Sequence, residues 1–437
     1  MTATTVEFAP QQVEAIDKIT DWFRSGDSQV FRLFGYAGTG KTTLARHIVD
    51  QLGVTALFAA FTGKAAYVLR SKGCDGAQTI HSLIYQPVEK VRKKLEQLQA
   101  LLDIETDPDE REILARAIAV EEEKLHTPDF ILREDSLLLG APLLVLDEVS
   151  MVGHRIAADL LSFGCKILCL GDPAQLPPVD GGGYFINADP DHLLTEIHRS
   201  ALDSPVTRLA TSVRKSPPGD RTLGMAGLDG DSGRVPAVTR QHVAEFDQVL
   251  VGTNKTRWKA IHLLRTLQGL HGPVPQPGDR IIGLANSTEA DIFNGQQFIV
   301  RSVLDQQPLP ADTDRVRLLV EDDSGTHRTL TTWLAGFTGQ EGEKLAKREG
   351  RGNIAACTFA QAITCHKSQG SQWDRVLVVD ESHIFARAAA DEAQRAGCTP
   401  DAAGAAAHLA GQRWLYTAIT RAAQRVVVIA SPRGLPA

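Results

Sequence analysis

The sequence of 437 residues contains only 6 cysteines, and no two of them form a Cys-x-x-Cys pair. We therefore expect neither a disulfide framework nor a zinc site. Cys165 and Cys169 flank the residues KIL in a predicted strand, which favours buried free thiols. This use of cysteine is typical of a protein from a reducing cytoplasm.

Three further features are missing. No apolar run approaches the roughly 20 residues that span a bilayer, so we expect no membrane role. The opening MTATTVEFAPQQ lacks the basic and apolar regions of a secretory signal. The formal net charge is −7, which argues against a protein that coats nucleic acid through bulk electrostatics. A narrow channel with a basic lining remains compatible with this charge.

What the sequence does contain is a series of short apolar runs rich in β-branched residues. A chain of this length fits two or three domains. The runs predict strands near 30–34, 54–60, 143–147 and 166–170, and a later set near 248–252, 375–380 and 425–430. Their alternation with helical segments predicts parallel sheets covered on both faces, hence two α/β domains. An Ala-rich stretch near 386–410 predicts surface helices.

Residues 88–126 interrupt this alternation and predict an antiparallel helical hairpin. Two apolar stripes have helical spacing: Val91, Leu95, Leu98 and Leu102, then Leu114, Ile118 and Leu125. IETDPDE supplies the turn, and Pro108 suits the start of the second helix. A solvated face is the ordinary interpretation of the hairpin's charges, and contact with nucleic acid or a partner is the alternative. These charges belong to Arg92, Lys93, Lys94, Glu121, Glu122 and Glu123.

Residues 276–357 form the second interruption and predict several short strands. Asn294-Gly295 before FIVRSV is typical of a type I′ hairpin turn. VRLLV, a DDSG turn and THRTL predict another hairpin. We expect a small β-barrel inserted into the second α/β domain.

Residues 35–42, GYAGTGKT, form a complete G-x-x-x-x-G-K-[ST] loop between a predicted strand and a helical pattern. Glycines let the backbone wrap closely around phosphates, and the following helix directs its positive end at them. Lys41 would neutralise phosphate charge, and the Thr42 hydroxyl would reach Mg²⁺. The residues expected to contact the nucleotide are Gly35, Gly38, Thr39, Gly40, Lys41, Thr42 and Thr43.

Two further segments carry polar residues at the end of a predicted strand or just beyond it. In LLVLDEVSMV, Asp147 would hold Mg²⁺ through its water shell, and Glu148 would take a proton from the attacking water. An acidic strand-end cap is the structural alternative. In LCLGDPAQLPPV, the amide of Gln175 suits orienting a water beside the γ-phosphate, although GDPAQ alone is also a plausible tight turn.

At this point the chain resembles superfamily 1 helicases, specifically the RecD/Dda-like branch called superfamily 1B. FAPQQVEAI is similar to the Q-motif, in which Gln12 is the expected reader of adenine and Gln11 the alternative. The other similar segments, in the family's order, are GYAGTGKT (motif I), FTGKAA (Ia), TIHSLI (Ib), LDEVSM (II), GDPAQLPPV (III), ITCHKSQGSQWDRV (V) and WLYTAITRA (VI).

The resemblance implies roles for further residues. Arg421 in TAITRA and Arg199 in EIHRS would reach the γ-phosphate across the cleft between the two domains. An ordinary surface arginine remains the alternative for Arg199. Contacts with the nucleic-acid strand are implied for Thr62, Lys64, Thr79, His81, His366, Lys367 and Ser368, and more weakly for Asn254 and Lys255. The two histidines would stack on bases or sugars, or else be buried structural groups.

The fold implied is α/β, with two RecA-like P-loop NTPase domains built on doubly wound parallel sheets, a helical 1B insert and a small SH3-like β-barrel 2B insert. We expect the first RecA-like domain, 1A, at 1–85 and 136–195, and the second, 2A, at 196–275 and 358–437. Insert 1B then covers 86–135 and insert 2B covers 276–357. The 1B element of relatives is often a short β-ribbon pin. Here it is helical and longer, so we assign no wedge residue.

The function implied is an ATP-dependent DNA helicase that uses ATP and Mg²⁺ and moves 5′→3′ on single-stranded DNA. A non-unwinding, strand-stimulated ATPase that remodels proteins and an RNA-directed translocase are the alternatives. The partners expected are single-stranded DNA, junctions of single- and double-stranded DNA, and replication or recombination proteins. We expect a monomer.

Overall fold

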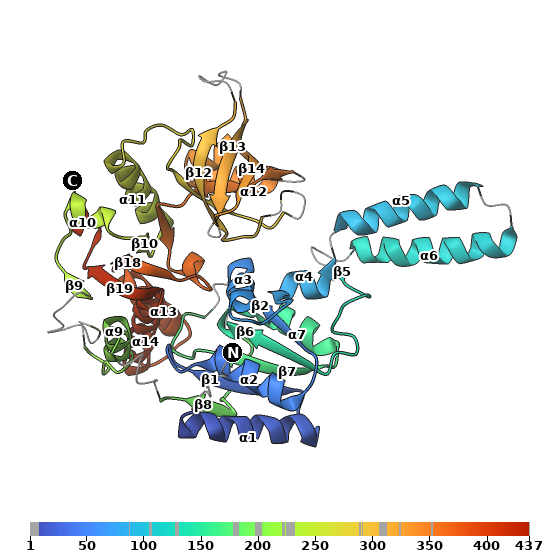
Figure 1. The fold of residues 1–437 in the computed structure, drawn as a ribbon, viewed down its shortest axis with the longest axis horizontal. Helices are drawn as coiled ribbons and strands as arrows, with labels where there is room; N and C mark the ends of the chain where they lie inside the picture. Colours follow the sequence, from blue (N-terminus) through green and yellow to red (C-terminus); the bar gives the residue numbers. More distant parts are fainter. Residues whose placement is uncertain are drawn as a thin grey trace, which may run out of the picture.

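The chain is described as a computed structural model that covers residues 8–86, 88–104, 107–126, 131–177, 183–196, 203–220, 223, 232–287, 290, 292–305, 313–322, 325–350 and 353–436. Within these ranges the chain forms two parallel sheets, a third, largely antiparallel sheet, a small two-stranded antiparallel sheet and a pair of long helices. Figure 1 shows the third sheet above the two parallel ones and the helical pair projecting to one side.

The first sheet has the order β3-β2-β6-β7-β1-β8, and its pairings are all parallel. Its strands are β1 (Val30–Gly35), β2 (Ala56–Ala60), β3 (Gln78–Thr79), β6 (Leu143–Asp147), β7 (Lys166–Gly171) and β8 (His192–Leu194). The associated helices are α1 (Pro10–Ser25), α2 (Lys41–Leu52), α3 (Gly63–Ser71), α4 (Ile80–Ile84) and α7 (His154–Ser162). The four long strands are nearly continuous apolar runs because helices pack on both faces of the sheet.

The second sheet has the order β17-β10-β18-β19-β9 and is also parallel. Its strands are β9 (Gly233–Val235), β10 (Gln248–Val251), β17 (Ala362–Thr364), β18 (Trp373–Val379) and β19 (Ala422–Ile429). Its helices are α9 (Pro205–Arg214), α10 (Arg240–Ala244), α11 (Asn254–Leu267), α13 (Ser382–Arg395) and α14 (Pro400–Ile419). All the strands predicted for the two α/β domains are present, and the predicted Ala-rich surface helices are α13 and α14.

The third sheet has the order β15-β14-β13-β12-β11-β16. Its strands are β11 (Arg280–Gly283), β12 (Gln297–Val303), β13 (Arg315–Asp322), β14 (His327–Trp333), β15 (Ile354–Ala355) and β16 (Cys357–Phe359), with α12 (Gln340–Glu349) beside them. Neighbours are antiparallel except β14 and β15. Because only Ala356 separates β15 at one edge from β16 at the other, the sheet must curl until its edges meet.

The predicted type I′ turn at Asn294-Gly295 is wrong. A type I′ turn needs positive φ at both central residues, but only Gly295 has one, at 88°. The amide of Gln296 donates to the carbonyl of Phe293 at 3.0 Å, which closes a turn with glycine at its third position. Such a turn matches type II, which needs positive φ at that position alone.

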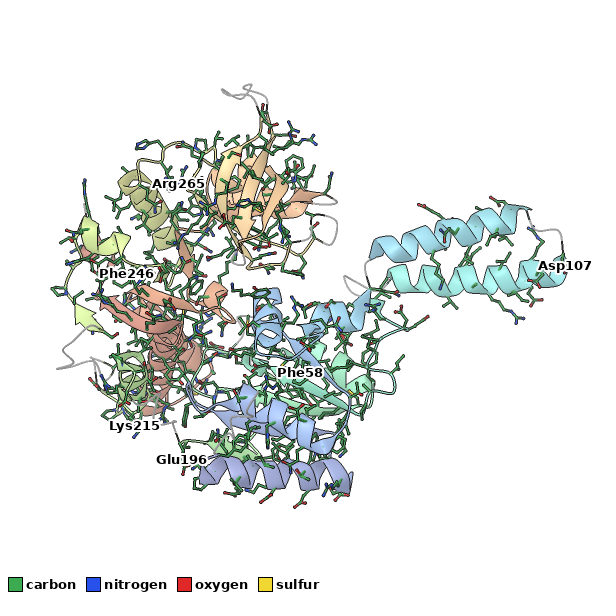
Figure 2. All side chains as sticks on the ribbon, viewed as in Figure 1. Phe58, Asp107, Glu196, Lys215, Phe246 and Arg265 are labelled. Carbon is green, nitrogen blue, oxygen red and sulfur yellow. The ribbon has the colours of Figure 1, made fainter. Side chains whose placement is uncertain are left out.

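The helical pair consists of α5 (Val88–Ile104) and α6 (Pro108–His126), joined to the first domain through β4 (Tyr85–Gln86) and β5 (Ile131–Leu132). Asp107 lies at the far tip (Figure 2). Ile118 is buried and Leu95, Leu98, Leu102 and Leu114 are half-buried, as the predicted stripes require, whereas Lys94 is exposed. The other side chains of the predicted stripes and charges lie outside the described ones: Val91, Arg92, Lys93, Glu121, Glu122, Glu123 and Leu125.

Both thiols predicted to be buried are so, and burial raises the pKa of Cys165 to about 11. In the described part of the chain, no helix combines the length and the apolar character that crossing a membrane requires.

Candidate active site

The predicted phosphate-binding loop, residues 35–42 and called the phosphate loop below, joins β1 to α2 and requires glycine for two different reasons. Gly38 and Gly40 have φ values of 83° and 75°, in the left-handed region that side chains disfavour. A Cβ at Gly35 would lie 2.6 Å from Oγ1 of Thr39 and 2.9 Å from Cβ of Leu194, too close for either contact. The ammonium of Lys41 lies along the loop and donates to the carbonyls of Gly35 at 2.6 Å and Tyr36 at 3.2 Å.

The two acidic residues predicted at the end of β6 lie beside this loop. Oδ2 of Asp147 accepts a hydrogen bond from the Thr42 hydroxyl at 3.1 Å. Glu148 has φ 56° and ψ 43°, an uncommon conformation for a residue other than glycine, and its amide donates to Oδ1 of Asp147 at 2.8 Å. Burial raises the pKa of Glu148, and Asp147 adds to the rise, while Arg421 and Lys41 oppose it.

Gln175 and Arg421 complete the site from two different sheets. With its amide oriented to satisfy both neighbours, Gln175 donates to Oε2 of Glu148 at 3.2 Å and accepts from Nη2 of Arg421 at 3.3 Å. The guanidinium of Arg421 also donates to the carbonyls of Thr417 at 3.2 Å and Ser371 at 3.3 Å. Arg421 is therefore held in place by backbone of its own domain and faces an acidic group of the other.

These side chains line one cavity of about 220 Å³ between the two parallel sheets. The predicted residues in its wall are Lys41, Thr42, Asp147, Glu148, Gln175 and Arg421. The hydroxyl and carboxylate oxygens of Thr42 and Asp147 are the hard ligands that Mg²⁺ prefers, so this pair fits the ion. Arg199, the second arginine predicted for the cleft, lies outside the described residues.

The two glutamines of the Q-motif have different partners. Gln12 is buried, accepts from the amide of Ala9 at 3.0 Å and donates to the carbonyl of Thr39 in the phosphate loop at 3.1 Å. The side chain of Gln11 instead accepts from the amides of Thr195 and Glu196. Gln12 is thus the one that contacts the loop. Thr39 is itself buried, whereas Thr43 points to an exposed position.

The residues predicted to bind a nucleic-acid strand lie just beyond the ends of β-strands in the two parallel sheets. Thr62 and Thr79 cap α3 and α4, and their hydroxyls accept from the amides of Ala65 and Ser82, both at 3.1 Å. The ring of His81 lies 5.7 Å from that of Phe61, beside Thr62. Burial lowers the pKa of Lys64, and the negative charge of Asp322 in the third sheet partly offsets this lowering.

The candidates from the second sheet differ in how accessible they are. The ring of His366 lies 5.4 Å from that of Phe385. Ser368 is fully buried, and its hydroxyl donates to the carbonyl of Cys365 at 2.6 Å, so its side chain shapes the turn. Burial lowers the pKa of both His366 and Lys367. Asn254, which accepts from Arg257 at 3.1 Å, and Lys255 begin α11, directly beyond the strand that pairs with β17.

Parts of all three sheets meet at the start of α3. A Cβ at Gly370 would lie 2.6 Å from Oγ1 of Thr62, so the second domain packs tightly against this helix end. A Cβ at Gly63 would lie 2.4 Å from Cβ of Phe293, a half-exposed aromatic residue of the third sheet's β11–β12 connection. This contact was not predicted, because it depends on how the inserted sheet sits over the first domain.

Sequence reasoning also missed two buried residues of the cleft, Asp172 and Tyr416. The Tyr416 hydroxyl donates to Oδ2 of Asp172 at 2.7 Å and accepts from the amide of Ala37 at 2.9 Å. Burial raises the pKa of Asp172, with Lys41 opposing. Asp172 could have been found by the rule that identified Asp147, since it also follows the end of a predicted strand. For Tyr416 no comparable signal exists beyond its place in WLYTAITRA.

Comparison with known proteins gives a consistent result. The sequence model of a family described as AAA domain matches residues 7–239, more than half of the chain. The chain is 27% identical over 381 residues to the ATP-dependent RecD2 DNA helicase of Deinococcus radiodurans, covering 80% of this chain and 43% of that protein. It is 29% identical over 195 residues to the ATP-dependent DNA helicase dda of Enterobacteria phage T4, covering 41% and 36%. The matched stretch thus spans less than half the length of either relative.

Among solved structures, Bacteroides Pif1 bound to ssDNA is similar, with a TM-score of 0.52, 18% identity and coverage of 98% of this chain and 94% of that one. At this identity the likeness concerns the fold, which is α/β with parallel, RecA-like sheets. The resemblance to the RecD/Dda-like branch of superfamily 1B is confirmed. The chain belongs to the AAA domain family.

Proposed function

We propose that this protein is an ATP-dependent DNA helicase that moves along single-stranded DNA. The observation that carries the proposal is the shared cavity. Lys41 and Glu148 from the first domain and Arg421 from the second line the same space, and Gln175 bridges the acid and the arginine. A triphosphate bound there would be contacted by both domains, so hydrolysis would change how firmly they are held together.

Each side chain has a distinct task in this mechanism. Lys41 exchanges its two carbonyl acceptors for phosphate oxygens. Glu148 accepts a proton from the attacking water, and Gln175 orients that water. Arg421 stabilises the charge that spreads over the phosphoryl oxygens, because its planar fork suits them. A Mg²⁺ ion held by Thr42 and Asp147 would neutralise phosphate charge.

The single-stranded DNA would run over the edges of both parallel sheets at which their β-strands end. Thr62, Lys64, Thr79 and His81 would hold it on the first domain, and Asn254, His366 and Lys367 on the second. Hydroxyls, amides and lysines grip phosphates without selecting a sequence. For Ser368, the backbone rather than the buried hydroxyl would serve. Opening and closing of the cleft would shift one set of contacts relative to the other, which moves the strand.

We further propose the domain limits given by the sequence: 1A at 1–85 and 136–195, 1B at 86–135, 2A at 196–275 and 358–437, and 2B at 276–357. The helical pair α5–α6 would then be insert 1B. The curled third sheet, whose last strand runs two residues beyond this limit to Phe359, would be an SH3-like insert 2B. The names of RecD2 and Dda as ATP-dependent DNA helicases support the activity. Movement 5′→3′, action on DNA junctions, a monomeric state, cytoplasmic location and contacts with replication or recombination proteins remain predictions from the resemblance.

Strand displacement with partial duplexes tests the proposal. Purified protein is mixed with Mg²⁺-ATP and a fluorescent duplex that carries either a 5′ or a 3′ single-stranded DNA tail. We expect displacement from the 5′-tailed substrate and none with Glu148→Gln. Strand-stimulated hydrolysis without displacement would favour a remodelling ATPase. Stronger stimulation by RNA than by DNA would favour an RNA-directed motor.

A further inference from the structure

A hydrogen-bonded chain crosses the cleft at Tyr416. The amide of Ala37, in the phosphate loop, donates to the Tyr416 hydroxyl at 2.9 Å, and that hydroxyl donates to Oδ2 of Asp172 at 2.7 Å. Tyr416 is 1% exposed and Asp172 is 2% exposed. The catalytic roles proposed above use neither residue.

The direction of this chain is fixed by chemistry. A backbone amide can only donate, so the Tyr416 oxygen must accept from Ala37, and its single proton is left for the carboxylate. Burial raises the pKa of Tyr416 well above its ordinary value, which keeps this proton in place. Because the cleft is buried, losing either hydrogen bond would leave a polar group unpaired and would cost free energy. Phenylalanine at position 416 would retain the ring packing and remove both.

The residues that flank Tyr416 connect the same two domains. Oγ1 of Thr417 accepts from the amide of Leu176 at 2.9 Å, within the segment that carries Gln175. Arg421 lies two residues beyond the end of α14, the helix that carries Tyr416 and Thr417. One helix end thus contacts the phosphate loop, the carboxylate of Asp172 and the segment of Gln175, and then presents the arginine.

A second contact to the same loop comes from another helix of the second domain. The guanidinium of Arg214, at the end of α9, lies 3.6 Å from the centroid of the Tyr36 ring, which it faces. Tyr36 and Ala37 are adjacent, so the outer part of the phosphate loop is held from the second domain at two neighbouring positions. The loop's conformation and the placement of α14 are therefore linked physically.

We propose that Tyr416 is a positioning residue that couples the phosphate loop to Arg421. The inference rests on the proposed ATPase function of the cleft. When the loop rearranges around phosphates, the Ala37 amide moves, and the hydroxyl of Tyr416 transmits this movement to the end of α14. Arg421 then reaches its working position only with the loop in its working conformation. Tyr416 itself need not touch the nucleotide.

The test compares strand-stimulated ATP hydrolysis by Tyr416→Phe in two backgrounds. In the wild-type background we expect kcat to fall about 10-fold or more, because Tyr416→Phe removes two buried hydrogen bonds and one of them is to a carboxyl group, while KM for ATP changes by less than about 3-fold. In the Arg421→Ala background, measured by single turnover, we expect the same change to cost less than about 2-fold. When two residues act as one unit, replacing the second after the first has already been replaced has little further effect on the rate.

Tyr85→Phe is the matched control. Tyr85 is also a buried tyrosine whose hydroxyl donates to a carboxylate, that of Asp159, but this pair lies within the first domain. We expect Tyr85→Phe to change kcat by the same factor, whether small or negligible, in both backgrounds. A general loss of stability would give this additive pattern for Tyr416→Phe as well.

Two results would overturn the inference: wild-type kcat in Tyr416→Phe, or an equal loss in both backgrounds. Failure of the proposed function would look different. In that case Arg421→Ala alone would hydrolyse ATP normally, or the wild-type protein would show no strand-stimulated hydrolysis.

Discussion

The hydroxyl of Thr42 donates a hydrogen bond to Oδ2 of Asp147 across 3.1 Å. Thr42 stands in the first turn of α2, and Asp147 ends β6, so two elements separated by 105 residues in the chain bring a hydroxyl and a carboxylate together. Mg²⁺ demands near-octahedral oxygen ligands and keeps several waters. Binding through one carboxylate and one hydroxyl, those of Asp147 and Thr42, would leave the remaining ligand positions to waters and phosphate oxygens.

Asp147→Asn should raise the Mg²⁺ requirement of ATP hydrolysis. The amide oxygen can still accept from Thr42, but the negative charge is gone, so we expect kcat at 1 mM Mg²⁺ to fall on the order of 100-fold and to recover partly at higher Mg²⁺. A titration of kcat against Mg²⁺ measures this. Asp21→Asn, on the exposed face of α1, is the control. An unchanged Mg²⁺ curve for Asp147→Asn would exclude its proposed role.

Glu148→Gln should abolish hydrolysis and yet stabilise the protein at neutral pH. Burial raises the folded-state pKa of Glu148 above its ordinary value, so the folded chain binds this proton more tightly than the unfolded chain does. The contribution of Glu148 to stability is thus fully present below the unfolded pKa and is lost as pH rises through the raised value. Glutamine removes this loss.

Thermal unfolding without added nucleotide tests the Glu148 prediction. We expect the Tm of Glu148→Gln to exceed that of the wild type by about 2 °C at pH 8, with the difference shrinking toward pH 5. A lower Tm at pH 8, or a difference that does not depend on pH, would contradict it.

Arg421→Ala should bind ATP but turn it over on the order of 1000-fold more slowly, the usual scale for loss of an arginine that stabilises phosphoryl transfer. Arg421→Lys keeps the charge but not the fork, so we expect it to recover only part of the rate. Affinity for a non-hydrolysable ATP analogue, measured by calorimetry, should stay within about 3-fold of wild type. Full activity of Arg421→Lys would show that charge alone suffices.

How far the sequence predicts the fold depends on how strands are buried. β1, β6 and the second half of β18 are covered on both faces, so they are largely apolar runs that stand out in the sequence. β3, β8, β9 and β17 have two or three residues each and were not predicted. They form because a long neighbour offers a partner, as β1 does for β8, and this pairing leaves no periodic signal.

The site divides in the same way. Lys41, Asp147 and Glu148 follow the ends of predicted strands, where local pattern and chemistry coincide. Tyr416 meets Ala37 and Asp172 across 379 and 244 residues of chain, and such contacts depend on the packing of two domains. The turn type predicted at Asn294-Gly295 was wrong for a different reason: the amides of Phe293 and Asn294 donate to the side chains of Gln296 and Asn286 in the same connection, and a two-residue pattern does not include these bonds.

Binding of single-stranded DNA should strengthen as pH falls from 8 to 6. Burial, together with the nearby positive charges of Arg257 and Lys347, lowers the pKa of Lys367 to about 7, while Glu343 opposes this lowering. The lysine is thus largely neutral at pH 8 and charged at pH 6, and only the charged form attracts a phosphate. Because the folded pKa lies below the ordinary value, the contribution of Lys367 to folding stability is present above that ordinary value and is lost as pH falls from it to about 7.

Fluorescence anisotropy with a labelled oligonucleotide at constant ionic strength measures the predicted pH dependence. We expect an increase in affinity of about 3- to 10-fold between pH 8 and pH 6 in the wild type and a much flatter profile in Lys367→Met. Lys347→Met should shift the wild-type profile to higher pH, because it removes a neighbouring positive charge. An unchanged pH profile in Lys367→Met would rule out strand contact by its ammonium.

The connection between the second domain and the third sheet depends on a buried ion pair. Arg265 of α11, labelled in Figure 2, donates to Oδ1 of Asp279 at 2.7 Å and to Oδ2 at 2.9 Å, and both side chains are almost fully buried. Gln361 also donates to Asp279, at 2.7 Å, from the second connection between the two units. The Asp279 carboxylate therefore contacts residues of both segments that connect the second domain to the third sheet.

Asp279→Ala should destabilise the protein by about 3–5 kcal/mol, because it leaves the Arg265 guanidinium buried without its counter-charge. Urea unfolding followed by fluorescence measures the loss. Arg301→Ala is the matched control: its pair with Glu321 has the same 2.7 Å separation but lies at the surface, with Arg301 exposed and Glu321 half-buried, so the midpoint should barely move. Equal effects of the two substitutions would contradict the prediction, because burial is the difference between the pairs. Asp279→Ala together with Arg265→Met should recover much of the loss, since removing both charges removes the unpaired one.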